Sequence, residues 1–219
     1  MHIPDGFIAP QLYAPAYAAA AGCWAVALRR MRRRLREETV PYLAVLTGAA
    51  FVLMTITVPL PGGTSVHATG VALLAVFFGP WIAFVCISIV LLMQALLLGM
   101  GGVTALPVNA LAIGLAGGWT AASVYRALHR WRPTAALFLA GWLSVLVASV
   151  LVALALGVQP QLAHDARGEP LFFPFGLGIT LPALVLPHLV AGVAEGALTV
   201  MVYRLLARIG WRATAQPEA

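Results

Sequence analysis

The chain of 219 residues is 62% hydrophobic and 9% charged, whereas a soluble domain has roughly 45–50% apolar and about 25% charged residues. This composition excludes a soluble globular domain and indicates an integral membrane protein. The apolar residues form long unbroken runs, not alternating stretches of ~10 residues, so we expect a helical bundle and not a membrane barrel. We expect one all-α membrane domain over residues 1–219.

The net charge of +6 is carried by arginine, because all 13 basic residues are Arg and none is Lys. Twelve of them fall in three clusters, at 29–36, 126–132 and 204–212. Arginines beside membrane spans mark the cytoplasmic side, which predicts a multi-pass membrane protein with its N-terminus outside. The first cluster is short, flanks a span and is followed by Glu37 and Glu38, so we expect contact with membrane lipid and not with nucleic acid.

Seven helices are predicted, and their apolar runs lie at 8–28, 40–60, 68–78, 81–98, 107–128, 134–158 and 175–206. The third run is too short to span, since a spanning helix needs ~20 residues. It ends at Gly79-Pro80, so its start is expected part-way into the membrane, with His67 in the outer half of the bundle. Small residues four apart, which allow close helix approach, occur at Ala14, Ala18 and Gly22 and at Gly114 and Gly118. Cys23 and Cys86 are expected to be reduced and buried.

The first seven residues are expected to form a plug that precedes a bundle over 8–209 and a cytoplasmic tail over 210–219. The Met1 amine, the His2 amide and the His2 imidazole are three nitrogens that can form two adjacent chelate rings around one cation. His67 lies on the same predicted side and can supply a fourth nitrogen. Four nitrogens in one plane suit Ni(II) or Cu(II), and imidazole also binds Co.

The alternative interpretation is structural: a histidine near a terminus is commonly solvated, and Pro4-Asp5-Gly6 can be a plain turn. Buried polar groups in a bundle are functional candidates by default. We therefore consider Asp5 as a carboxylate supporting a ligand histidine, and His188 and Glu195, seven residues apart, as an ion path or as structural groups. The remaining candidates for supporting a metal site are Thr64, Ser65, Gln94 and Asn109, although hydrogen bonding between helices is the favoured role of Gln94 and Asn109. No HExxH, GxSxG or Walker A sequence occurs, so no enzyme is expected.

Several segments, taken together, resemble one family along most of the chain. They are Met1-His2-Ile3-Pro4-Asp5-Gly6, Gly63-Thr64-Ser65-Val66-His67 with Thr69-Gly70, Phe78-Gly79-Pro80, Gln94-Ala95-Leu96, Gly101-Gly102-Val103-Thr104 with Asn109, Pro187-His188-Leu189, and Glu195-Gly196. The chain resembles the nickel/cobalt substrate-binding components of energy-coupling factor transporters, the CbiM/NikM family. The resemblance implies that Met1, His2 and His67 hold the metal, which is Ni(II) or Co(II) as a transported substrate and not a cofactor.

The resemblance also implies partners: a transmembrane coupling subunit, cytoplasmic ATPase subunits that hydrolyse ATP, and a small accessory membrane subunit in some systems. The chain itself would be a non-catalytic capture subunit in a prokaryotic inner (plasma) membrane, and imported cobalt would feed cobalamin synthesis. Many cobalt-type members have Cys-Ser-His-Pro-Thr-Gly around the loop histidine, whereas this chain has Ser-Val-His-Ala-Thr-Gly at 65–70. Nickel and cobalt therefore both stay open. Two other functions remain as alternatives, a stand-alone proton-coupled metal transporter and a non-transporting membrane scaffold.

Overall fold

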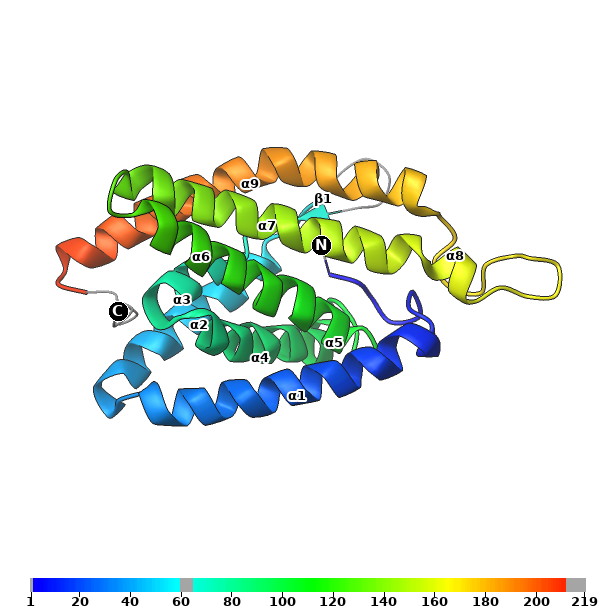
Figure 1. Ribbon diagram of the computed structural model, residues 1–219, viewed down its shortest axis with the longest axis horizontal. Helices are drawn as coiled ribbons and strands as arrows, with labels where there is room; N and C mark the ends of the chain where they lie inside the picture. Colours follow the sequence, from blue (N-terminus) through cyan, green and yellow to red (C-terminus); the bar gives the residue numbers. More distant parts are fainter. Residues whose placement is uncertain (1, 60–64, 212–219) are drawn as a thin grey trace.

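The computed structural model describes residues 2–59 and 65–211, which form a helical bundle (Figure 1). The first half contains α1 (Pro10–Arg34), a 3-10 turn η1 (Glu37–Thr39), α2 (Val40–Thr55), the short strands β1 (Val58–Pro59) and β2 (Ser65–Val66), α3 (Val71–Phe78) and α4 (Pro80–Leu98). The second half contains α5 (Leu106–Asn109), the π-helical segment η2 (Ala110–Gly117), α6 (Gly118–Leu128), α7 (Pro133–Gly157), the single turn α8 (Gln159–Leu162) and α9 (Leu177–Arg208).

The seven predicted helices are confirmed. They are α1, α2, α3, α4, the continuous helix formed by α5, η2 and α6, then α7 and α9. In the described part of the chain, four helical stretches are long and apolar enough to cross a membrane: Glu37–Thr55, Pro80–Leu98, Pro133–Leu162 and Leu177–Arg208. The first helix is not one of these four, since its apolar part is rich in alanine and its last turn consists of arginines.

Three predicted boundaries were wrong, each for a local physical reason. The first helix continues past Leu28 to Arg34, because arginine is a good helix former and suits the negative end of the helix dipole. The second ends at Thr55 instead of residue 60, because the chain turns into β1, which pairs antiparallel with β2. The third begins at Val71 instead of residue 68, because Gly70 has a left-handed backbone with φ of 67°.

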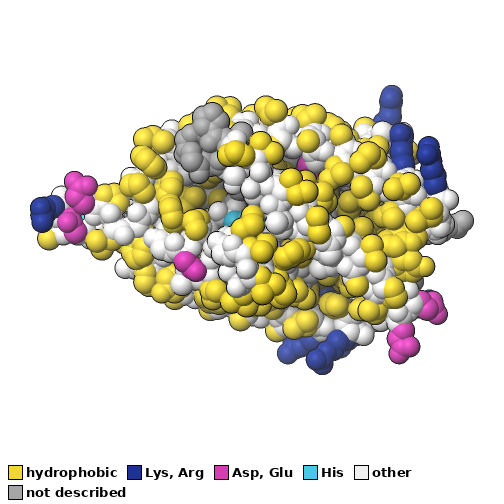
Figure 2. All heavy atoms as spheres, turned by 180° about the vertical axis from the view of Figure 1, so that it is seen from behind, with side chains coloured by type: hydrophobic (Ala, Val, Ile, Leu, Met, Phe, Trp, Pro, Cys, Tyr) yellow, Lys and Arg dark blue, Asp and Glu magenta, His cyan; other side chains and the backbone are white. Residues whose placement is uncertain are grey.

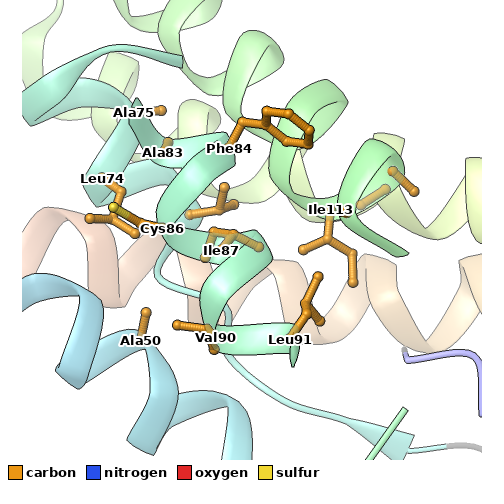
Figure 3. Close-up of a cluster of buried hydrophobic side chains, with 14 of the residues drawn as sticks. Ala50, Leu74, Ala75, Ala83, Phe84, Cys86, Ile87, Val90, Leu91 and Ile113 are labelled. Atoms are coloured by element: carbon orange, nitrogen blue, oxygen red, sulfur yellow. The ribbon is translucent and has the colours of Figure 1, made fainter. Parts of the chain in front are cut away.

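The core of the bundle lies around α4, which contacts α1, α2, α3 and the 106–128 helix. Figure 3 shows side chains of α4 between those of α2, α3 and η2. Gly114 permits this packing, because a Cβ there would lie 3.2 Å from the Phe84 ring and 3.4 Å from Ile87. The prediction that Gly114 marks a close helix contact is thus confirmed.

The long helices α7 and α9 form the most extensive helix pair. Gly196 of α9 lies directly against α7, because a Cβ there would stand 2.6 Å from the Phe138 carbonyl oxygen. Such a backbone approach is open only to glycine. The contact fixes the height of α9 relative to the rest of the bundle.

The arginine-bearing segments lie together. In Figure 1 the end of α1, the α6–α7 turn and the end of α9 are at the same end of the molecule. Figure 2 shows basic side chains gathered toward that end, with acidic ones beside them, and both basic and acidic side chains on the opposite tip. The clustering expected from the sequence is therefore present.

Candidate metal site

The segment from His2 to Ala9 turns back from the start of α1 into the bundle (Figure 1). Asn109, at the start of the π-helical stretch, holds it by two hydrogen bonds. The Ile3 amide donates to Asn109 Oδ1 and Asn109 Nδ2 donates to the Ile3 carbonyl, both at 3.0 Å. Ile3 is fully buried. The amide side chain thus acts like a neighbouring strand and fixes the residue next to His2.

Asp5 anchors the same segment from its exposed side. Its carboxylate accepts hydrogen bonds from the Val103 and Thr104 amides, at 3.1 and 2.8 Å, and from the Thr104 hydroxyl. Burial alone would raise the pKa of Asp5, but these bonds outweigh it and hold the pKa below its ordinary value. Asp5 was considered either as a hydrogen-bond partner of His2 or His67 or as a plain turn residue, and in the structure its acceptor oxygens bond to the 103–104 loop.

His67 lies between β2 and α3 with 7% of its surface exposed. Its Nδ1 is 3.2 Å from the Ala68 carbonyl oxygen, an arrangement in which Nδ1 carries the proton. Metal-binding histidines usually donate one ring N–H to a carbonyl in this way, which leaves the other nitrogen for the metal. Here that other nitrogen is Nε2, which is buried and has no hydrogen-bond partner among residues 2–59 and 65–211.

The tertiary fold brings the His2 and His67 rings together, with centroids 4.4 Å apart and planes tilted by 49°. The His2 Nε2 is likewise buried and unpartnered within the described part of the chain. Burial lowers the pKa of His67 to about 3 and lowers that of His2 well below its ordinary value. Both rings are therefore neutral at neutral pH, which is the form that binds a metal ion.

No group of three or more His, Cys, Asp or Glu side chains among the described residues can hold a metal. The arrangement expected from the sequence does not need one, because two of its four nitrogens belong to the backbone. Met1, which would provide the terminal amine, and Thr64 lie outside the described residues.

Glu195 of α9 fixes the loop that carries His67. Its carboxylate is 2% exposed and accepts three hydrogen bonds: from the Thr69 amide at 2.8 Å, and from the Thr69 hydroxyl and the Gly70 amide at 2.9 Å. No side chain of α3 caps its own N-terminus, so Glu195 caps it from another helix. A carboxylate suits this position because of the positive end of the helix dipole. Glu195 has the structural role that we considered in place of an ion path.

His188 lies two helical turns before Glu195 and is 1% exposed. Its Nδ1 is 2.6 Å from the Leu184 carbonyl oxygen of the preceding turn. Its Nε2 is buried with no partner among the residues that the structure describes. The two residues thus share a buried face, as their spacing predicts.

The other predicted supporting residues are not all at the site. Gln94 donates from Nε2 to the Phe51 carbonyl oxygen and to the Thr55 hydroxyl, at 3.2 and 3.3 Å. It therefore ties α4 to the end of α2, which is the hydrogen bonding between helices that was favoured for this residue over a brace on the His67 loop. Ser65 is in β2 opposite Pro59, two residues before His67.

Sequence reasoning missed Gln159, which is fully buried at the start of α8. Its Oε1 accepts a hydrogen bond from the Ala9 amide at 2.8 Å, and its Nε2 donates to the Ala155 carbonyl at 2.6 Å. Gln159 therefore holds the C-terminal end of the inserted segment, as Asn109 holds its start. The only available signal was an uncharged polar residue directly after a long apolar run.

Comparison with known proteins places the chain among metal transport proteins. The family described as "Cobalt uptake substrate-specific transmembrane region" (CbiM) matches residues 2–213. The probable fused nickel transport protein LarMN of Lactiplantibacillus plantarum is 38% identical over 95% of this chain and 65% of its own length. The cobalt transport protein CbiM of Streptomyces coelicolor is 35% identical over 94% of this chain and 88% of its own.

A solved structure has the same fold. The crystal structure of a truncated transition metal transporter superimposes with a TM-score of 0.91 at 35% identity, covering 95% of this chain and 99% of the other. This chain spans just under two thirds of the length of the fused nickel transport proteins that it matches.

Proposed function

Since the chain belongs to the CbiM family of cobalt uptake substrate-specific transmembrane proteins, we propose that it captures Ni(II) or Co(II) for an ATP-driven importer. The observation that carries this proposal is the pair of the half-buried His2 and the buried His67, whose ring centroids are 4.4 Å apart. The buried, unpartnered His67 Nε2 costs free energy unless it meets a partner, and a cation supplies one. The ion is the substrate and no resident cofactor is invoked.

The proposed ligand set is the Met1 amine, the His2 amide and imidazole nitrogens, and His67 Nε2. Two chelate rings and an imidazole place four nitrogens in one plane, which suits Ni(II), while imidazole also accepts Co(II). Asn109 and Asp5 hold the inserted segment, and Glu195 holds the loop with His67. In this proposal, the segment with His2 and the loop with His67 are held in position before the metal arrives.

The proposed division of labour leaves ATP hydrolysis to partner subunits. A transmembrane coupling subunit and cytoplasmic ATPases would drive release of the ion inward, with an accessory membrane subunit in some assemblies. The row Ala14, Ala18 and Gly22 on α1 supports a helix contact of this kind, because all three are exposed and a Cβ at Gly22 would meet nothing within 4 Å. Small residues on a lipid-facing helix allow a second helix to approach closely.

The proposed orientation in the plasma membrane has the N-terminus outside and the arginine end in the cytoplasm. It rests on the excess of arginine that short cytoplasmic loops carry. Under this orientation the inserted segment opens toward the outside, where the ion is captured.

The direct test measures binding of nickel and cobalt to purified protein. One variant carries an extra alanine before Met1, which moves the terminal amine away from His2, and a second is His67→Ala. The matched control is His164→Ala, since His164 lies exposed in the loop after α8. We expect both site variants to lose binding and the control to keep it. If both site variants bind like the parent, the proposed site is wrong.

Competition between the two metals in the same assay addresses selectivity between nickel and cobalt.

A stand-alone proton-coupled transporter is the alternative, and it predicts uptake into vesicles that contain this chain without an ATPase. Uptake only in the presence of ATPase subunits supports the proposal. A non-transporting scaffold predicts that deleting the chain leaves cellular metal unchanged.

A further inference from the structure

A second feature lies at the arginine end of the bundle, on the side formed by α7 and α9. An open groove with a volume of about 1240 Å³ lies between the start of α7 and the last third of α9. Its walls come from these two helices and from the turn before α7. It is separate from the inserted segment, since none of residues 2–9 lines it.

The lining of the groove is apolar in one part and basic in another. Its floor is apolar and includes Phe138, Leu139, Val200 and Met201, while its rim carries Arg132, Arg204 and Arg208. The α9 members are residues 197, 200, 201, 204, 205 and 208. They are spaced as one helix face. That face is apolar toward the middle of the bundle and basic toward its end.

The hollow results from small side chains beside large ones. Ala135 and Ala197 are exposed in the groove, whereas Trp131 stands out from its rim with 85% of its surface exposed. Tryptophans concentrate at the level of lipid headgroups. Trp131 therefore indicates that the rim is at headgroup depth and the floor at acyl-chain depth.

The rim of the groove carries positive charge. The Arg204 guanidinium donates to the Thr134 hydroxyl at 2.7 Å, which ties it to α7. Within residues 2–59 and 65–211, Arg132 and Arg208 have no carboxylate partner. No acidic residue is among those that line the groove.

We propose that this groove binds one anionic phospholipid, with its phosphate among Arg132, Arg204 and Arg208 and an acyl chain along the floor. Guanidinium groups recognise phosphate by charge and by paired hydrogen bonds, and basic pockets between membrane helices on the cytoplasmic side bind anionic headgroups. The bound lipid would brace the α7–α9 pair, on which the position of Glu195 depends.

The test counts lipids bound to the purified protein by native mass spectrometry. The probes are dioleoyl phosphatidylglycerol, dioleoyl phosphatidylcholine and glycerol phosphate without chains. The groove variant replaces Arg132, Arg204 and Arg208 by Gln, and the matched control replaces Arg29, Arg32 and Arg33 by Gln, so both lose three charges. A second variant, Ala197→Phe, fills the floor without changing charge.

We expect the parent and the matched control to prefer phosphatidylglycerol over phosphatidylcholine. The groove variant should bind phosphatidylglycerol roughly a hundredfold more weakly, since each arginine near an anionic surface contributes about 1 kcal/mol and about 1.4 kcal/mol is a factor of ten. Ala197→Phe should weaken both phospholipids, and glycerol phosphate alone should bind weakly.

Three results would overturn the proposal. Equal losses in both triple variants would mean that only overall charge attracts lipid. Tight binding of glycerol phosphate would mean an anion site without a role for the acyl chain. If the groove variant keeps its lipid but no longer copurifies with a transmembrane partner, or no longer self-associates, the groove is a protein interface instead.

Discussion

Replacing Glu195 gives the most specific test of how the metal site is held in position. The Glu195 carboxylate accepts hydrogen bonds from the Thr69 amide, the Thr69 hydroxyl and the Gly70 amide. In Glu195→Gln one oxygen becomes an NH₂ group, which is a donor facing donors. If the remaining oxygen stays toward Gly70, the Thr69 amide loses its acceptor, and the α3 N-terminus loses the negative charge beside it.

The size of the effect follows from the kind of bond lost. A hydrogen bond to a charged group contributes about 1.5–3 kcal/mol, and leaving a buried donor unpaired costs a similar amount. At about 1.4 kcal/mol per factor of ten, losing one such bond lowers metal affinity by about ten- to a hundredfold, provided that the loop with His67 must be ordered to bind. Glu195→Ala, which removes all three bonds, should lower affinity further.

The assay is titration calorimetry of purified protein with nickel, with circular dichroism to confirm that each variant is folded. The matched control is Thr199→Val, one turn further along α9, because the Thr199 hydroxyl bonds only to the Glu195 carbonyl of its own helix. The control should bind nickel like the parent. Folded Glu195→Gln protein with parental affinity would refute the role of Glu195 in positioning His67.

Three further predictions concern the inserted segment and the partner contact. Asn109→Leu leaves the buried Ile3 amide and carbonyl unpaired, so nickel affinity measured by calorimetry should fall at least tenfold, at about 1–3 kcal/mol for each unpaired group; unchanged affinity contradicts the anchoring role. Asp5→Asn should weaken nickel binding by the same factor at pH 6 and pH 8. The pKa of Asp5 is lowered, so its stabilising charge is present throughout this range and is lost only as the pH falls through that lowered pKa. A loss seen only at pH 8 would argue against this. Gly22→Leu should leave nickel binding by the purified chain intact but reduce copurification with a transmembrane coupling subunit; normal copurification would exclude this face of α1 as the contact.

The network around the metal site explains why single changes outside the ligands should matter. Asn109 and Gln159 hold the two ends of the inserted segment, and Glu195 holds the loop opposite. None of these three side chains is a proposed ligand. Each holds a segment of the chain that includes a proposed ligand, so its loss should lower metal affinity without abolishing coordination.

The sequence by itself determined the class of protein, the number of helices and the clustering of arginine. These properties depend on composition and on the length of apolar runs, which a membrane constrains strongly. It also indicated the pair His2 and His67, because a histidine beside the chain terminus and a histidine before a short helix are both visible in the order of residues. Their use as ligands stays a prediction.

Only the tertiary structure decided which polar groups meet. Asp5 had two possible roles, beside a histidine or in a turn, and the structure shows that its carboxylate bonds to Val103 and Thr104. Gln94 was expected to bond between helices, and only the structure identifies its partner as the end of α2. Glu195 meets Thr69 across 126 residues of chain, and Ile3 meets Asn109 across 106. Which side chains become partners depends on how the helices pack and how far each is shifted along its axis. Close glycine contacts, such as Gly196 against the Phe138 carbonyl, fix those shifts. The spacing of residues along the sequence does not determine that packing.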